Sequence, residues 1–168
     1  MTASAEKLSM TPEEAAACGM VIALHAEMAP ERPAILSPLG DRTYSELNAR
    51  SNQLVRALRS AGLKEGDAVA LLCANRPEFV ETCVALSRCG MRLTPINWHL
   101  TAEEIGYIVE NCEAKSFIAD ARFAEKAAEA SSMSPHLVQK LAVAGEIAGF
   151  TSYDEARPLN LHTISRTQ

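Results

Sequence analysis

Hydrophobic positions recur at helical spacing in several stretches of the chain, and four of these open with a pattern typical of a helix N-terminus. In this pattern a side-chain oxygen accepts a backbone N–H, and a carboxylate three residues later reaches back. The four starts lie at residues 11–14, 43–46, 75–78 and 101–104. They predict four helices, of which the first runs as one amphipathic helix over residues 11–28.

Short, continuous apolar runs lie between these helices, at residues 68–73, 91–96, 116–119 and 140–144. Strands that are apolar at every position are typical of parallel sheets, because helices cover both faces of such a sheet. A further helix over residues 121–131 completes the alternation of strands and helices. The pattern predicts an α/β fold, a mainly parallel sheet with helices on both faces.

Glycine and proline mark the ends of several elements. Gly62 and Gly90 follow helical stretches and are predicted to close them as C-caps. Pro95 suits the end of a strand, where its fixed backbone angle and missing N–H are tolerated. The apolar residues 33–36 and the turn at 37–42 predict a small hairpin before the second helix.

Composition narrows the class of protein. A chain of 168 residues, 48% hydrophobic and 22% charged, suits one globular domain. The formal charge of -5, with scattered Lys and Arg, argues against nucleic acid as a partner. The apolar runs are too short for a transmembrane helix and the N-terminus lacks an apolar signal core, so a cytoplasmic location is expected. Five cysteines without a CxxC pair predict buried thiols and no metal site.

Three segments carry a family pattern: RTYSEL at 42–47, GLKEGDAVALLCANRPEFV at 62–80, and ALSRCGMRLTPINWHLTAEEIGYIVENCEAKSFIAD at 85–120. With them, the stretch from about residue 30 to 154 resembles the first subdomain of the adenylate-forming superfamily of AMP-binding enzymes. The segment INWHLT is similar to the corresponding segment of AMP-forming acyl-CoA synthetases that act on fatty or related organic acids.

The resemblance implies a division of the chain into three regions. Residues 1–29 form an N-terminal helix region, and residues 30–157 form a partial N-terminal subdomain of an AMP-binding synthetase. Residues 158–168 form a divergent tail that is expected to be disordered. The sequence after TSYDEA does not lead toward the family's phosphate loop. A frameshift, an early stop or a partial gene sequence would each explain this departure.

The family reaction implied is the conversion of a carboxylic acid, ATP and CoA to acyl-CoA, AMP and pyrophosphate, with Mg. No stretch of this chain matches the Ser/Thr/Gly-rich phosphate loop that ends in Pro-Lys, and none matches the C-terminal Lys domain. We therefore expect an N-terminal fragment of an acid–thiol ligase that holds no cofactor itself, has no catalytic residue and is inactive alone.

His99 is the one candidate for ligand contact, because some CoA ligases of this family carry a basic residue near the path of the CoA nucleotide. An imidazole there could meet a phosphate. The alternative is a loop histidine that is satisfied by the backbone. Trp98 is predicted to anchor its loop to the helices rather than to stack on adenine, and Glu46 and Asn75 are predicted to serve in helix caps.

Two other functions stay open at this stage. The chain could be a non-catalytic interaction module that docks onto a full-length homologue, or a stand-alone α/β ligand-binding domain with its pocket at the carboxyl ends of the strands. Because later segments cover part of this subdomain in the family, we expect it to expose apolar surface and to self-associate.

Overall fold

The structure is a computed structural model, and it describes residues 10–157. Its centre is a five-stranded sheet with the strand order β4-β3-β5-β6-β7, in which every neighbouring pair is parallel. The strands of this sheet are β3 (Ala68–Leu72), β4 (Arg92–Pro95), β5 (Ala114–Asp120), β6 (Gln139–Val143) and β7 (Thr151–Ser152). The predicted parallel α/β fold is confirmed.

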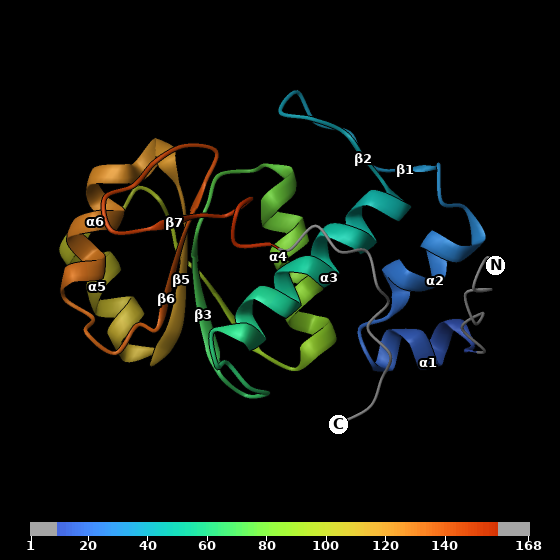
Figure 1. The fold of residues 1–168 in the computed structure, drawn as a ribbon, viewed down its shortest axis with the longest axis horizontal. Coiled ribbons are helices and arrows are strands. Elements are labelled where there is room, and N and C mark those ends of the chain that lie inside the picture. Colours follow the sequence, from blue (N-terminus) through green and yellow to red (C-terminus); the bar gives the residue numbers. More distant parts are fainter. Residues whose placement is uncertain (1–9, 158–168) are drawn as a thin grey trace.

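Helices cover both faces of this sheet (Figure 1). One face carries α3 and α4, and the other carries α5 and α6. These helices are α3 (Tyr44–Ser60), α4 (Pro77–Cys89), α5 (Ala102–Asn111) and α6 (Ala124–Ser132), the last preceded by a 3₁₀ turn η1 (Ala121–Phe123). The helix predicted over 121–131 therefore exists, with a tighter first turn.

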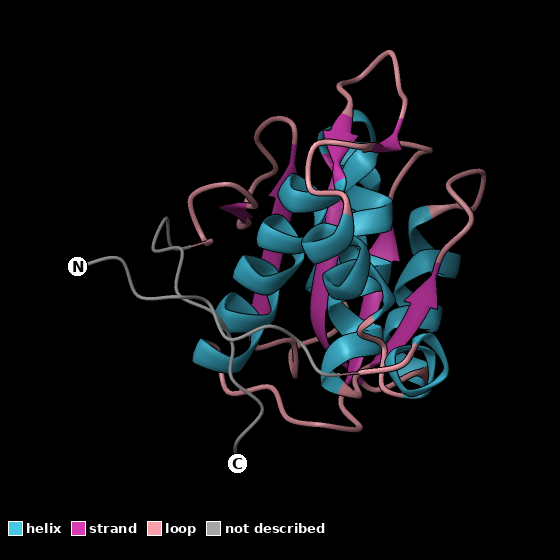
Figure 2. Ribbon diagram, turned by 90° about the vertical axis from the view of Figure 1, so that its right-hand side faces the viewer, coloured by secondary structure: helices cyan, strands magenta, loops and turns pink. Residues whose placement is uncertain are grey.

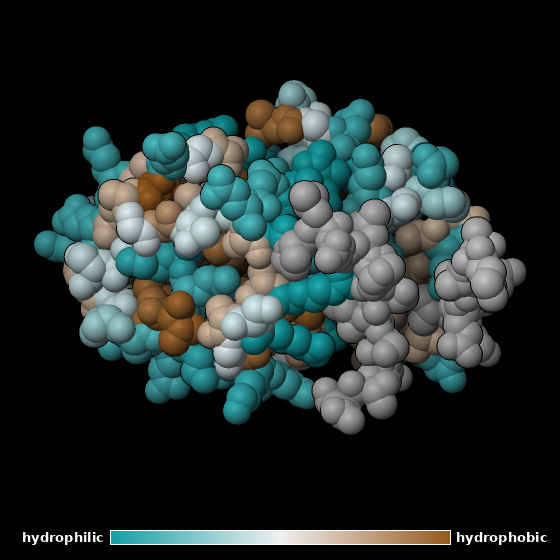
Figure 3. All heavy atoms as spheres, viewed as in Figure 1, coloured by the Kyte–Doolittle hydropathy of each residue, from teal (hydrophilic) through white to brown (hydrophobic). Residues whose placement is uncertain are grey.

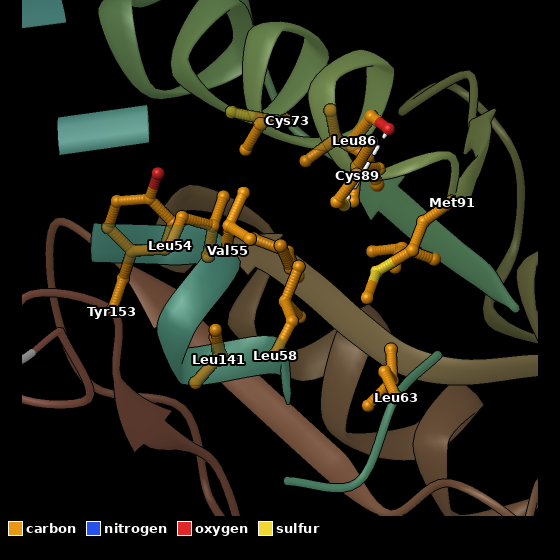
Figure 4. Packing of buried hydrophobic residues seen from close by; sticks show 14 of the residues in the cluster. Leu54, Val55, Leu58, Leu63, Cys73, Leu86, Cys89, Met91, Leu141 and Tyr153 are labelled. Atoms are coloured by element: carbon orange, nitrogen blue, oxygen red, sulfur yellow. Dashed lines mark hydrogen bonds between the residues drawn. The ribbon is translucent and has the colours of Figure 1, made fainter. Parts of the chain in front are cut away.

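Alternation along the strands divides the core into two clusters. Val69 and Leu71 of β3 point toward α3 and α4, whereas Ala70 and Leu72 point toward α5 and α6. Figure 4 shows the first cluster, in which Leu54 and other side chains of α3 meet side chains of α4 above the sheet. Burial of apolar surface on both faces is the main force that holds the layers together.

The chain before α3 forms a smaller unit that packs on the outer side of α3. Two helices, α1 (Pro12–Ala17) and α2 (Val21–Met28), precede an antiparallel pair of short strands, β1 (Pro33–Ile35) and β2 (Arg42–Thr43). The predicted hairpin is therefore confirmed. Figure 2, turned by 90°, shows helices in front of the central strands and other helices behind the sheet. Among the helices of residues 10–157, none combines the length and apolar character that a bilayer crossing requires.

Three predicted helix starts are confirmed in atomic detail. Thr11, Thr43 and Thr101 each accept a backbone N–H from the glutamate three residues on, and the glutamate side chain accepts the N–H of the threonine. Glu46 is thus a capping residue, as expected. Gly90 ends α4 with a φ of 68°, in the left-handed region that favours glycine.

The prediction of one helix over residues 11–28 was wrong, since α1 and α2 are separated at Gly19. Gly19 has a φ of +70°, and a Cβ added there would lie 2.7 Å from the carbonyl oxygen of Ser87 in α4. The chain therefore turns where it touches another helix. Helical spacing of apolar residues continued across the turn, so periodicity alone could not show the break.

The prediction that Asn75 caps the third helix was also wrong. Arg76 occupies the N-cap position without a side-chain cap bond, and Pro77 begins the helix. Glu78, expected to complete a capping box, instead accepts a hydrogen bond from Arg76 Nε at 2.7 Å. A cation next to Glu78 competes with the backbone for its carboxylate, and the charged bond is the stronger one.

The expectation that every strand is covered on both faces holds for the central strand β3, which is buried throughout, but not for β4. β4 is an edge strand whose first and last residues, Arg92 and Pro95, are exposed. Proline is tolerated there because an edge position needs no N–H on its outer side. The tail expected to be disordered, residues 158–168, lies outside the described residues, and β7 was not predicted.

Candidate functional site at the carboxyl edge of the sheet

The sheet changes its winding direction between β3 and β5. The chain leaves β3 into α4 on one face, whereas it leaves the neighbouring strand β5 into α6 on the other face. In open α/β sheets such a point leaves a crevice at the carboxyl ends of the strands, where ligands bind. The residues that follow β3, β4 and β5 are therefore the candidate site.

Arg76 lies at this point with its side chain 11% exposed. Its Nε donates to Glu78 at 2.7 Å and its Nη1 donates to Asp120, at the end of β5, at 3.3 Å. Burial by itself would lower the pKa of Arg76, but the two carboxylates outweigh this and raise it. Arg76 is thus already paired with two carboxylates of the same chain.

Cys73 follows β3 directly and is 2% exposed. Burial, reinforced by the charge of Asp120, raises the pKa of its thiol to about 12. The thiol therefore stays protonated near neutral pH and is a poor nucleophile. Cys89 is likewise buried, and Cys18, Cys83 and Cys112 are part-buried, which fits the predicted role of the cysteines as packing residues.

His99 lies in the loop that follows β4, and it is exposed. Its backbone N–H donates to Asn97 Oδ1 at 3.0 Å, and its ring lies 5.7 Å from the ring of Trp98. The backbone is satisfied, as one interpretation expected, while the imidazole stands at the surface, as the other requires. A contact between His99 and CoA stays a prediction.

The loop that carries His99 is held in place by its neighbours. Trp98 is half-buried and stacks on Phe123 of η1 with ring centroids 6.1 Å apart. Lys126 of α6 donates to the carbonyl oxygens of Trp98, at 3.2 Å, and Leu100, at 2.9 Å. Trp98 thus anchors this loop to the segment after β5, the role predicted for it, and the loop conformation at His99 is fixed by packing.

A buried charge cluster was missed by the sequence analysis. Glu81 of α4 has no exposed side-chain surface, yet its carboxylate contacts three guanidinium groups. Arg42 Nε lies 3.0 Å away, Arg157 Nη1 lies 3.2 Å away, and Arg50 Nε donates to the same carboxylate. The hydroxyl of Tyr153 adds a fourth contact at 3.2 Å. We call these five residues the Glu81 cluster.

The Glu81 cluster joins segments that are far apart in sequence. Arg42 belongs to β2, Arg50 to α3, and Arg157 to the turn that follows β7. Asp154 balances part of the extra positive charge, because it accepts from Arg50 at 3.2 Å and from Arg157. Burial raises the pKa of Tyr153, so its hydroxyl stays neutral. The available signal was a glutamate in the middle of a largely apolar helix, since such a charge needs a partner.

The charged side chains of these clusters are largely paired with one another. Within residues 10–157 no three His, Cys, Asp or Glu side chains are grouped so that they could hold a metal ion. The buried arginines near the carboxyl edge are matched by Glu78, Glu81, Asp120 and Asp154. A triphosphate would need donors that are not already engaged.

Comparison with known proteins decides the family. The family model described as AMP-binding enzyme matches residues 22–162. This chain belongs to the AMP-binding enzyme family. Its match includes both the Glu81 cluster and the carboxyl edge of the sheet, so both are parts of the family domain.

Two of the curated relatives that this chain matches are named as ligases. The chain is 30% identical over 129 residues to a 3-oxocholest-4-en-26-oate–CoA ligase of Rhodococcus rhodochrous, which covers 76% of this chain and 23% of the relative. It is 37% identical over 87 residues to a fatty acid–[acyl-carrier-protein] ligase of Streptomyces coeruleorubidus, covering 52% of this chain and 17% of the relative. The chain thus spans about a fifth of the length of these relatives.

Solved structures agree on the fold. An anthranilate CoA ligase in complex with anthranoyl-AMP matches 86% of this chain with a TM-score of 0.79 and 22% identity, and the match covers 29% of that ligase. A benzoate CoA ligase of Burkholderia xenovorans matches 82% of this chain with a TM-score of 0.73 and 18% identity, over 27% of that ligase. At this level of identity the likeness concerns the fold alone.

Proposed function

We propose that this chain is the N-terminal scaffold of an adenylate-forming ligase that joins a fatty or related carboxylic acid to CoA, and that the chain alone does not catalyse the reaction. The match to the AMP-binding enzyme family over residues 22–162 is the observation that carries the proposal. The names of the relatives support the substrate class, since they are ligases of a steroid acid and of fatty acids.

The chemistry of the described residues supports the proposal that the chain alone is inactive. Acyl-adenylate formation needs donors aimed at a phosphate and a cation to offset its charge. In this chain the buried guanidinium groups around Glu78, Glu81 and Asp120 are engaged with carboxylates. Their role is to hold the strands and helices in place, so that a carboxyl edge of fixed shape is presented.

A direct assay tests the proposed inactivity. Purified chain is incubated with a medium- or long-chain fatty acid, ATP, Mg and CoA, and AMP and acyl-CoA are quantified by chromatography. We expect no product above the protein-free control, whereas the full-length Rhodococcus rhodochrous ligase with its own steroid acid provides the positive control. Turnover by the chain alone would refute this part of the proposal.

A chimera tests the scaffold role. Residues 22–157 replace the matching segment of the Rhodococcus rhodochrous ligase, and acyl-CoA formation is compared with that of the parent enzyme. Because the segment is proposed to supply shape and not chemistry, the chimera should retain activity. A folded chimera, shown by a cooperative thermal transition, that makes neither acyl-adenylate nor acyl-CoA would contradict the scaffold role.

The same chimera tests the proposed contact between His99 and CoA. His99 is exposed, so its replacement by alanine should leave folding intact. We expect His99→Ala to raise the KM for CoA and to leave the KM for ATP unchanged. The matched control is His136→Ala, which changes another exposed histidine, one that contacts Glu110 instead. An equal KM for CoA in the two variants would show that His99 does not contact CoA.

A further inference from the structure

A second arginine of α4 lies in surroundings unlike those of the Glu81 cluster. Arg88 Nη1 donates to Asn52 Oδ1 of α3, but Nε and Nη2 of the same side chain are covered from solvent and have no hydrogen-bond partner. Asn48, one helical turn before Asn52, also has a covered and unpartnered Oδ1. The outer part of the α3–α4 layer therefore contains buried polar groups that are better satisfied in water.

The turn between α1 and α2 lies against this part of the layer. Gly19 in that turn packs so closely on Ser87, the neighbour of Arg88, that an added Cβ would lie 2.7 Å from the Ser87 carbonyl oxygen. Figure 1 shows α1 and α2 as an outer layer next to α3. Only one residue of each helix is fully buried, Ala15 in α1 and Ala23 in α2. The larger apolar side chains of α2, Ile22 and Leu24, are only half-buried, so α1 and α2 bury less apolar surface per residue than the core helices do.

The interface between α1–α2 and α3–α4 thus combines buried polar groups with less apolar burial than the main layers have. Burial lowers the pKa of Arg88, because desolvation disfavours the charged guanidinium. Opening this interface would bring water closer to Arg88, which follows Ser87 in α4. It would break the contacts of Ala23 and of the half-buried Ile22 and Leu24, together with the stacking of His25 on Tyr44 at 4.9 Å.

We propose that α1 and α2 form a cover that detaches from α3 and α4 as one unit while the sheet stays folded, and that detachment exposes Arg88 to solvent. The hinge lies just after α2. Beyond it the chain is fixed, because Ser45 N–H donates to the carbonyl oxygen of Pro30 and Tyr44 N–H donates to that of Arg32, each at 3.0 Å. Local opening of this kind is expected where few apolar contacts are buried.

Hydrogen exchange of the whole chain, followed by mass spectrometry, tests the proposal. Peptides from residues 12–28 should exchange faster than peptides from β3 and β5 in the absence of denaturant. Arg88→Met removes the unpartnered charge, so exchange in residues 12–28 should slow by roughly tenfold. The matched control is Arg59→Met in α3, which changes an exposed arginine and should leave that rate unchanged.

Two further variants keep the test decisive if Arg88→Met disturbs folding. Asn48→Leu removes the orphan acceptor and should also slow exchange in residues 12–28. Gly19→Ala puts a Cβ against the backbone of Ser87 at a left-handed φ, so it should speed exchange in residues 12–28 and leave β3 and β5 unchanged. The proposal is overturned if residues 12–28 exchange together with the sheet, or if these variants change both regions equally.

Discussion

The two faces of the sheet are covered by different kinds of contact. The α3–α4 layer combines large apolar side chains with the Glu81 cluster, which crosses from α4 to β2, α3 and the turn after β7. The α5–α6 layer is held by apolar contacts, many of them between small residues such as Ala127 and Ala130 around Phe117. One layer thus depends on matched buried charge and the other on close packing.

The difference teaches where each layer is vulnerable. A buried carboxylate surrounded by guanidinium groups contributes little net stability compared with an apolar substitute, but the loss of one partner leaves the others uncompensated. A close-packed apolar layer instead loses stability in proportion to the volume removed. The two layers should therefore respond differently to substitutions, to pH and to changes at the surface.

The largest effect is expected from Glu81→Ala. Three arginines would lose their shared carboxylate, whose side chain has no exposed surface. Removing one partner of a buried ionic group costs about 3–5 kcal/mol. The free energy of unfolding, measured in urea, should fall by that amount. Glu81→Gln retains the shape and some hydrogen bonds, and a loss as large as that of Glu81→Ala would show that charge and not bonding geometry matters.

A smaller effect is expected from Phe117→Leu in the opposite layer. Phe117 is fully buried and packs edge-on against Phe150, with ring centroids 5.7 Å apart. Leucine keeps the site apolar but leaves part of the ring volume empty, so about 1–2 kcal/mol should be lost. Urea unfolding should show this loss without a change in the slope of the free energy of unfolding against urea concentration. A loss comparable to that of Glu81→Ala would contradict the contrast between the layers.

Sequence patterns predicted the layers better than their contacts. The strands over 68–73, 91–96, 116–119 and 140–144 and the helix starts at Thr11, Thr43 and Thr101 follow from local rules, and the structure confirms them. Burial periodicity and capping act within a few residues, so one sequence contains the necessary information. The fold class was therefore within reach.

What could not be predicted depends on residues that are distant in sequence. Glu81 meets Arg157 across 76 positions and Arg42 across 39, and no local pattern joins them. The break at Gly19 is likewise set by Ser87 of another helix. In the same way, the pairing of Arg76 with Asp120 at the candidate site exists because β3 and β5 are neighbours in the sheet. His99, in contrast, became a candidate only through the family resemblance.

An exposed charge pair provides a third test of the comparison. Asp67, before β3, accepts from Lys115 Nζ at 2.8 Å and from the backbone of Lys64 at 2.7 Å. The hydrogen bond from Lys115, followed by that from Lys64, lowers the pKa of Asp67 below its ordinary value of 3.8. A carboxyl whose pKa is lower in the folded state adds stability above its unfolded pKa, and that stability is lost as pH falls through the folded pKa.

The pH dependence of unfolding should therefore change in the variant Asp67→Asn. The Lys115 side chain is 47% exposed, and exposed pairs are worth about 0–1 kcal/mol, so the loss near neutral pH should be small. As pH falls below 3.8 and through the lower folded pKa of Asp67, the variant and the parent should converge, because the parent carboxyl then becomes protonated in the folded state. Urea titrations at several pH values measure this. A constant difference down to the lowest pH would show that the carboxyl acts through packing and not through charge.

The smallest effect on stability is expected at the tip of the hairpin. Leu36 and Leu39 lie in the turn between β1 and β2 and are 77% and 47% exposed. Apolar atoms stand out at this place in Figure 3. Because both side chains remain largely in water, replacing them with serine should change the free energy of unfolding by less than about 0.5 kcal/mol.

Association between copies should nevertheless respond to the same double variant. Exposed leucines next to one another favour contact with other apolar surface, whereas neither layer of the core is involved. We expect the parent chain to self-associate as its concentration rises, and Leu36→Ser with Leu39→Ser to shift sedimentation toward the monomer at equal concentration. Replacing the exposed Tyr107 on α5 with serine is the matched control, since it removes a similar apolar area from the opposite layer. If the control shifts sedimentation as much as the double variant, association depends on total apolar area and not on the hairpin.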